Sequence, residues 1–262
     1  MKRAFGHNEV PELDPFLLLD DFHSHNPNDY IAGFPWHPHR GIETVTYMLE
    51  GSVEHGDSMG NKGVILPGDV QWMTAGSGII HQEMPKGKNG NMWGFQLWVN
   101  LPSTHKMMEP RYREVKKEQI PTVTKDEDVK IRIICGNFED TKGPVRDIVV
   151  DPEYLDITMV KGTEFEHSIK RGYRAFVYVI EESGYFDTNK EKPISNEHLV
   201  IFKDGDNVKI TAGERGLRFL LVSGKPLDEP VAWAGPIVMN TQEELDLAFR
   251  EYRNGTFIRN KK

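Results

Sequence analysis

Residues 34–41 read FPWHPHRG and residues 78–85 read GIIHQEMP. Each contains two residues of metal-binding type separated by one position: His37 with His39, and His81 with Glu83. In a β-strand, residues two apart point to the same face of the sheet. On neighbouring strands of a sheet or barrel, all four side chains would therefore point into one cavity. We predict a metal site made of three imidazoles and one carboxylate.

A further acidic residue leaves the identity of the carboxylate ligand open. Glu43 follows His39 by four positions, so strand alternation places it on the same face as His37 and His39. Either Glu43 or Glu83 is the ligand, and the other is a hydrogen-bond partner of the site or a general base. Imidazole and carboxylate together suit Fe(II), Mn, Ni, Cu or Zn, and a ligand set without cysteine argues against a closed structural zinc site. Four protein ligands on a six-coordinate metal leave two positions for water, substrate or dioxygen.

Other histidines are weaker candidates for metal binding. His23 and His25 lie in a polar loop without a strand to fix their geometry, and His167 is followed two positions later by Ile169. The second half of the chain echoes the strand and turn pattern of the first, but it lacks a comparable pair of ligands. We therefore predict two related barrels, with a metal site in the first alone.

The composition predicts an all-β protein of two domains. Among its 262 residues, 24 Gly and 16 Pro are scattered between many short apolar runs, which is typical of β-sandwiches and barrels. The charged, proline-bearing segment 102–128 is expected to link the domains, which we place at residues 1–118 and 119–262. Near the end, Thr241-Gln242-Glu243-Glu244 matches a capping box. It predicts one terminal helix that packs on a barrel and belongs to the second domain.

Charge and cysteine content limit the expected partners and compartment. The net charge is −8 with both signs well mixed, which argues against direct nucleic-acid binding. The chain has no run of about 18 apolar residues and no signal-peptide pattern, so we expect neither a membrane span nor secretion. The one cysteine, Cys135, is expected to be a buried apolar residue in a reducing compartment. These features predict a cytoplasmic protein, which would also enter the nucleus in a eukaryote.

The two ligand segments and their surroundings resemble a known family. The succession His37–Val45, followed by residues 67–85 (PGDVQWMTAGSGIIHQEMP), closely resembles the pirins of the cupin superfamily. Further resemblance lies in residues 14–18, 96–101 and 235–241, so it spans nearly the whole chain. It implies a bicupin of two double-stranded β-helix (jelly-roll) barrels. Because pirins are expected to have about 20 residues before the counterpart of Met1, it also implies a missing N-terminal strand and an unpaired barrel edge.

The resemblance implies a site and an activity as well. In pirins the counterparts of His37, His39, His81 and Glu83 hold a single iron ion, which favours Glu83 as the ligand and leaves Glu43 as its support. The implied activity is that of a quercetin 2,3-dioxygenase with Fe(II) as cofactor. In that reaction a flavonol binds the metal, and a carboxylate, Glu83 or Glu43, accepts its hydroxyl proton before O2 opens the ring. The family also implies an alternative function, a metal-dependent transcriptional co-regulator that binds protein partners rather than DNA.

Overall fold

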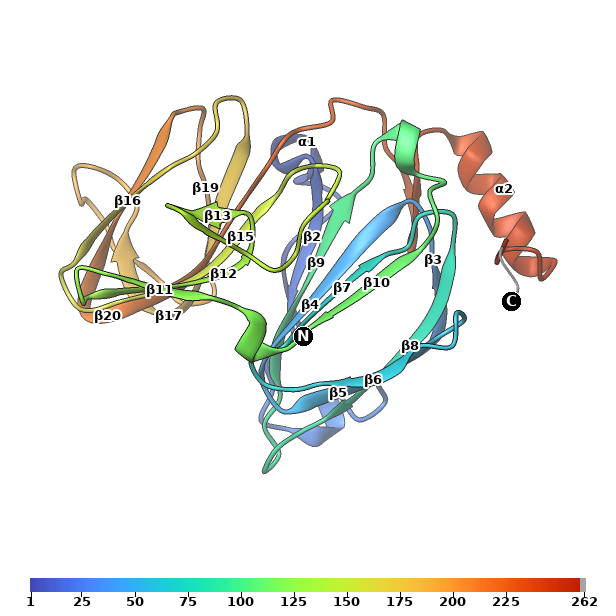
Figure 1. Cartoon of the computed structure of the whole chain (residues 1–262), viewed down its shortest axis with the longest axis horizontal. Helices are drawn as coiled ribbons and strands as arrows, with labels where there is room; N and C mark the ends of the chain where they lie inside the picture. The colour runs from blue at the N-terminus through green and yellow to red at the C-terminus, as the bar shows by residue number, and fades with distance from the viewer. Residues whose placement is uncertain (260–262) are drawn as a thin grey trace. The chain divides into compact units, whose positions relative to one another are not determined.

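A computed structural model, which describes residues 1–259, shows a chain of β-strands in two compact units (Figure 1). Among the described residues, unit 1 comprises 1–6, 16–117 and 227–259, and unit 2 comprises 7–15 and 118–226. The predicted all-β, two-barrel fold with a terminal helix is confirmed. The break between Lys117 and Glu118 lies one residue before the expected boundary, and residues 7–15 belong to unit 2 rather than to the first domain as expected.

Two antiparallel sheets face one another in unit 1 (Figure 1). One has the strand order β1-β2-β9-β4-β7-β10 and the other the order β3-β8-β5-β6. The six-stranded sheet consists of β1 (Lys2–Phe5), β2 (Phe16–Asp21), β9 (Trp93–Asn100), β4 (Ile42–Glu50), β7 (Val70–Thr74) and β10 (Arg111–Val115). The four-stranded sheet consists of β3 (Phe34–His39), β8 (Ile79–Lys86), β5 (Ser52–Asp57) and β6 (Lys62–Ile65).

The central strands of the six-stranded sheet are covered on both faces. Residues 42–48 of β4 and all five residues of β7 are buried, although each strand contains polar residues. Polar residues within such strands point to the interior and need partners there. Thr46 and Gln71, which lie opposite one another in the β4–β7 ladder, are two such residues.

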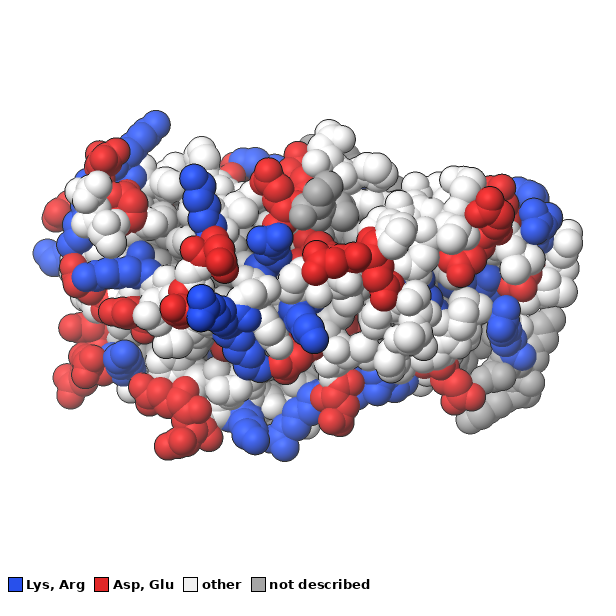
Figure 2. All heavy atoms as spheres, turned by 90° about the horizontal axis from the view of Figure 1, so that it is seen from above, with Lys and Arg blue, Asp and Glu red and all other residues white. Residues whose placement is uncertain are grey.

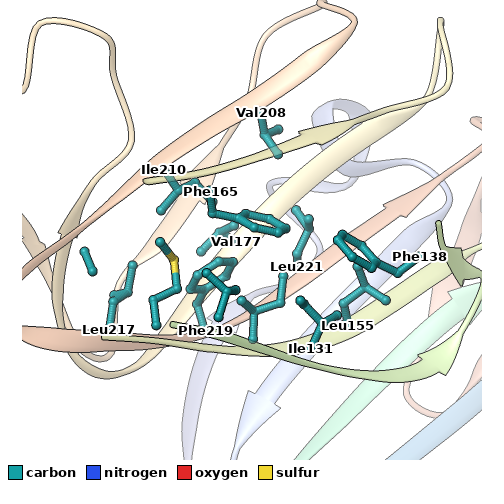
Figure 3. Packing of buried hydrophobic residues seen from close by; sticks show 14 of the residues in the cluster. Ile131, Phe138, Leu155, Phe165, Val177, Val208, Ile210, Leu217, Phe219 and Leu221 are labelled. Atoms are coloured by element: carbon teal, nitrogen blue, oxygen red, sulfur yellow. The ribbon is translucent and has the colours of Figure 1, made fainter. Parts of the chain in front are cut away.

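Unit 2 has one eight-stranded sheet with the order β11-β12-β15-β20-β17-β18, in which β16 pairs with β20 and β19 with β17. Its core contains Phe165, Val177, Phe219 and Leu221, which point toward one another (Figure 3). Cys135 is buried at the end of β12, as predicted. The strands are β11 (Thr122–Lys125), β12 (Val129–Cys135), β15 (Glu153–Met159), β16 (Glu164–Ser168), β17 (Arg174–Tyr185), β18 (Ile194–Ser195), β19 (Leu199–Ile201) and β20 (Asn207–Gly224). The short pair β13 (Asn137–Phe138) and β14 (Thr141–Lys142) and the one-turn helix α1 (Val10–Leu13) complete the unit.

The C-terminal segment returns to unit 1 rather than completing unit 2. It forms β21 (Ala232–Ala234), β22 (Ile237–Met239) and α2 (Gln242–Arg253), and the predicted capping box between Thr241 and Glu244 is present. The structure differs here from the expected domain limits. The reason is packing, because Ile237, Met239, Leu245, Ala248 and Phe257 form one buried cluster with Ile80 of β8 against it.

The surface carries both signs of charge. On the face shown in Figure 2, Lys and Arg side chains are interspersed with Asp and Glu. No helix within residues 1–259 is both long and apolar enough to cross a membrane.

Candidate metal centre

Three of the four predicted ligands meet at the junction of β3 and β8. These strands are antiparallel neighbours, and His37 lies directly opposite His81 in their ladder. One potential ligand atom from each of His37, His39 and His81 lies within 4.8 Å of the others, and this is the one such cluster found in residues 1–259. His39 and His81 are buried and His37 is half-buried. The arrangement thus offers three imidazoles to one cation.

Hydrogen bonds on the far side of two rings orient them for metal binding. His37 Nδ1 lies 2.8 Å from the carbonyl oxygen of Pro35, and His39 Nδ1 lies 3.1 Å from that of Pro236. A carbonyl oxygen only accepts, so each Nδ1 carries the hydrogen and each Nε2 presents a lone pair. The two Nε2 atoms are 3.0 Å apart. Two nitrogens bound to one metal at about 2.1 Å, at a right angle, are separated by about 3 Å. The residues therefore fit a metal ion.

His81 provides independent support for this fit. Within the described residues, neither of its ring nitrogens has a hydrogen-bond partner, although both are buried. A buried, unpaired polar group is costly, and a bound cation would remove that cost for one of the two nitrogens. Burial lowers the pKa of His81 to about 4 and the pKa of His39 well below its ordinary value. Both rings are therefore neutral at pH 7, which is the form that binds metals.

Glu83 lies on the same strand as His81 but contacts the facing sheet. Its carboxylate accepts hydrogen bonds from Thr46 Oγ1 at 3.2 Å and from Gln96 Nε2 at 3.1 Å. Gln96 in turn accepts a hydrogen bond from Trp98 Nε1 at 3.3 Å. The carboxylate is buried and held between the two sheets. It is not part of the closely spaced group of imidazole nitrogens.

Glu43 does not lie on the histidine face, which corrects the expectation from strand alternation. The chain leaves the four-stranded sheet at His39 and enters the six-stranded sheet at Ile42, so the alternation does not continue through the corner. Within β4, Thr46 points to Glu83. Glu43 precedes Thr46 by three residues, an odd number, so its side chain points to the opposite face of the sheet. There the buried Glu43 accepts a hydrogen bond from Thr74 Oγ1 at 2.5 Å, and burial raises its pKa.

A polar chain beside Glu83 was not predicted from the sequence. His55 lies opposite Glu83 in the β5–β8 ladder. Its Nδ1 is 2.6 Å from the Tyr112 hydroxyl, and its Nε2 is 2.6 Å from Glu114 Oε1. Because a carboxylate only accepts, Nε2 carries the hydrogen and the tyrosine donates to Nδ1. The sequence signal for this polar chain was weak, because Tyr112 and Glu114 fell within the segment 102–128 that was expected to link the domains, and no motif singled out His55.

A mainly apolar cavity borders this site. It meets the site at Glu83 and is not lined by the three histidines; Thr46, Gln96, Ser24 and Asp29 contribute its other polar groups. Most of the remaining lining is apolar or aromatic: Phe22, Tyr30, Phe34, Val53, Pro85 and Met92. Such a cavity with few polar groups is typical of a site for a small organic ligand.

The other histidines singled out in the sequence have different surroundings. His23 stacks on Trp93 with ring centroids 4.3 Å apart, and His25 Nδ1 lies 2.9 Å from Asn91 Oδ1. In unit 2, His167 Nε2 lies 2.8 Å from Glu153 Oε2. These contacts account for each ring without a metal.

Comparisons with known proteins agree with the fold and the sequence motifs. The family model described as Pirin matches residues 1–99, and the one described as Pirin C-terminal cupin domain matches residues 154–258. Pirin-1 of Arabidopsis thaliana is 45% identical, over 92% of this chain and 83% of its own length. A pirin-like protein of Caulobacter vibrioides is 43% identical, over 98% of this chain and 92% of its own length. The crystal structure of a quercetin 2,3-dioxygenase from Acinetobacter baumannii has a TM-score of 0.86 at 32% identity and covers 97% of this chain and 90% of that one. The chain therefore belongs to the pirin family.

Proposed function

We propose that this protein is a metal-dependent dioxygenase that opens the ring of flavonols such as quercetin with O2. The observation that carries the proposal is the convergence of three imidazoles near a buried carboxylate, Glu83, which also lines a mainly apolar cavity. The likeness to the Acinetobacter baumannii quercetin 2,3-dioxygenase supports the substrate class. We further propose Fe(II) as the metal, because a nitrogen and oxygen ligand set without sulfur suits it; Mn, Ni, Cu and Zn are the competing ions.

We propose that His37, His39, His81 and Glu83 hold the ion. When bound, the metal supplies Lewis acidity and reactivity toward O2. Glu83 would accept the flavonol hydroxyl proton on a carboxylate oxygen, because Thr46 and Gln96 fix its orientation at the cavity. The apolar side chains of Phe22, Phe34 and Met92 would exclude water from the bound ring. Glu43 has no part in this chemistry, because it points to the other face of its sheet.

Oxygen uptake with quercetin tests the proposal directly. Protein loaded with Fe(II) under anaerobic conditions is mixed with quercetin and air-saturated buffer, and O2 consumption is followed together with the loss of flavonol absorbance. We expect turnover by the wild type and none above background by His37→Ala. Equal rates in the two proteins would refute the activity and favour the alternative, a metal-dependent protein that binds regulatory partners.

A further inference from the structure

Arg40 follows the ligand His39 directly, and its guanidinium is buried at the corner between β3 and β4. Its Nε donates to the Ser77 carbonyl oxygen at 2.7 Å, and its Nη2 donates to that of Phe257 at 3.0 Å. Its Nη1 forms an ion pair with Glu251 at 2.6 Å, and the guanidinium lies 4.2 Å from the centroid of the Phe257 ring. A buried cation with this many fixed partners is strongly held.

These contacts join the two strands that carry the metal ligands. Ser77 lies in the turn that leads into β8, four residues before His81. The backbone N–H of Gly41 donates to the Gly76 carbonyl oxygen at 2.8 Å, beside the bond from Arg40 to Ser77. The end of β3 is therefore fixed to the beginning of β8. The relative positions of the His37–His39 pair and His81 depend on this connection.

The C-terminal segment, residues 235–257, closes the same corner. Arg40 forms a parallel β-bridge with Ile237, and the Val238 N–H donates to the Arg40 carbonyl oxygen at 3.1 Å. Pro236, which directly precedes Ile237, supplies the carbonyl oxygen that orients His39. The buried Lys106 Nζ donates to the carbonyl oxygens of Gly41 at 2.9 Å and Val238 at 3.1 Å. The segment thus contacts His39 both directly and through Arg40.

We propose that Arg40 and the C-terminal segment position the metal ligands, so that Glu251 and Phe257 set the metal affinity and the ligand geometry of a site they do not touch. This inference rests on the proposed metal centre but not on the proposed reaction. Partners that orient metal ligands through hydrogen bonds typically change metal affinity 10- to 100-fold when they are replaced.

The test compares two substitutions on the same helix. Glu251→Gln removes the charge that pairs with Arg40, whereas Glu243→Gln changes an exposed residue in the first turn of α2. Co²⁺ is used as the probe, its affinity is measured by competition with a chromophoric chelator, and the visible spectrum is recorded at saturation. We expect Glu251→Gln to bind Co²⁺ about tenfold more weakly, with a changed spectrum, and Glu243→Gln to match the wild type in both.

A further variant separates positioning from stability. Phe257→Leu keeps the carbonyl oxygen and an apolar side chain but removes the ring that contacts Arg40. We expect weaker Co²⁺ binding and a changed spectrum, both to a smaller extent than in Glu251→Gln. Should Glu251→Gln fail to fold, Phe257→Leu decides the question by itself. A lower melting temperature with unchanged Co²⁺ affinity and spectrum would overturn the proposal. Absence of quercetin turnover in the wild type would refute the proposed activity and leave this result standing.

Discussion

At the residue scale, His81 shows most clearly how the fold prepares a metal ligand. Its buried ring has no hydrogen-bond partner among residues 1–259, and burial lowers its pKa from 6.5 to about 4. Between these two pH values the unfolded chain binds a proton at His81 and the folded chain does not. The stability of the metal-free protein should therefore fall as the pH falls from 6.5 to 4, by up to about 3 kcal/mol from this residue.

Urea unfolding of the metal-free protein at pH 7 and pH 4.5 measures this contribution. We expect the free energy of unfolding to fall less in His81→Gln than in the wild type, because glutamine does not titrate. His39, whose pKa is also lowered by burial, should act in the same direction. The same fall in both proteins would show that His81 does not titrate abnormally.

Replacement of Glu83 and of Glu43 by glutamine should have different effects on metal affinity. Glu83→Gln should weaken metal binding at least about tenfold, because we propose Glu83 as a ligand. Glu43→Gln should leave it unchanged, because Glu43 faces away and contacts Thr74. Equilibrium dialysis with Ni²⁺ or Fe²⁺ measures both. Full metal binding by Glu83→Gln would refute the assignment of Glu83 as a ligand.

The i, i+2 spacing predicted the gathering of His37, His39 and His81 because all three lie within regular strands. The same alternation failed at Glu43, where the chain changes sheets at Arg40 and Gly41 between two strands that look continuous in sequence. The roles of Arg40 and Pro236 were also missed. They depend on contacts about 200 residues apart in the chain, which no local pattern encodes.

At the element scale, the corner between β3 and β4 has space only for glycine. Gly41 has a φ of +78°, and an added Cβ would lie 1.9 Å from the Val238 carbonyl oxygen. Gly60 also has a positive φ, +92°, but nothing lies within 4 Å of its added Cβ. Gly41→Ala should therefore lower the free energy of unfolding by about 1–3 kcal/mol more than Gly60→Ala, because Gly60→Ala introduces backbone strain but no steric clash. Equal losses in urea unfolding would show that the C-terminal segment does not pack tightly against this corner.

Strand β10 shows why an element can be hidden in the sequence. Residues 102–128 look like a charged linker, yet Arg111–Val115 pair along β7 as an edge strand of the six-stranded sheet. Edge strands commonly carry charged side chains, which protect them from pairing with other chains. By contrast, the apolar run 129–135 coincides with β12, because β12 is a largely buried strand.

At the scale of the whole molecule, the two-barrel organisation was predictable but the course of the chain was not. The apolar stripe of α2 indicates that the helix packs on a barrel, but it does not say on which one. In the structure, residues 227–259 belong to unit 1, although the chain reaches them from unit 2. The choice is made by side chains such as Ile237 and Phe257, which pack in the first unit.

Metal binding should therefore stabilise one unit and not the other. A ligand that binds only the folded state at 100 times its dissociation constant adds about 2.7 kcal/mol to stability. In hydrogen exchange followed by mass spectrometry, we expect added metal to slow exchange in β3, β8 and the C-terminal segment. Peptides from residues 129–224 should exchange at the same rate with and without metal. If metal slowed exchange in residues 129–224 as much as in β3 and β8, a further metal site in unit 2 would be indicated.

We propose that the histidines of β3 and β8 hold one metal ion per chain. Elemental analysis of freshly purified protein, followed by equilibrium dialysis against Fe²⁺ under anaerobic conditions, tests it most directly. We predict one metal ion per chain in the wild type and in His167→Ala, and almost none in His81→Ala. A His81→Ala protein that retains one ion per chain would contradict the account.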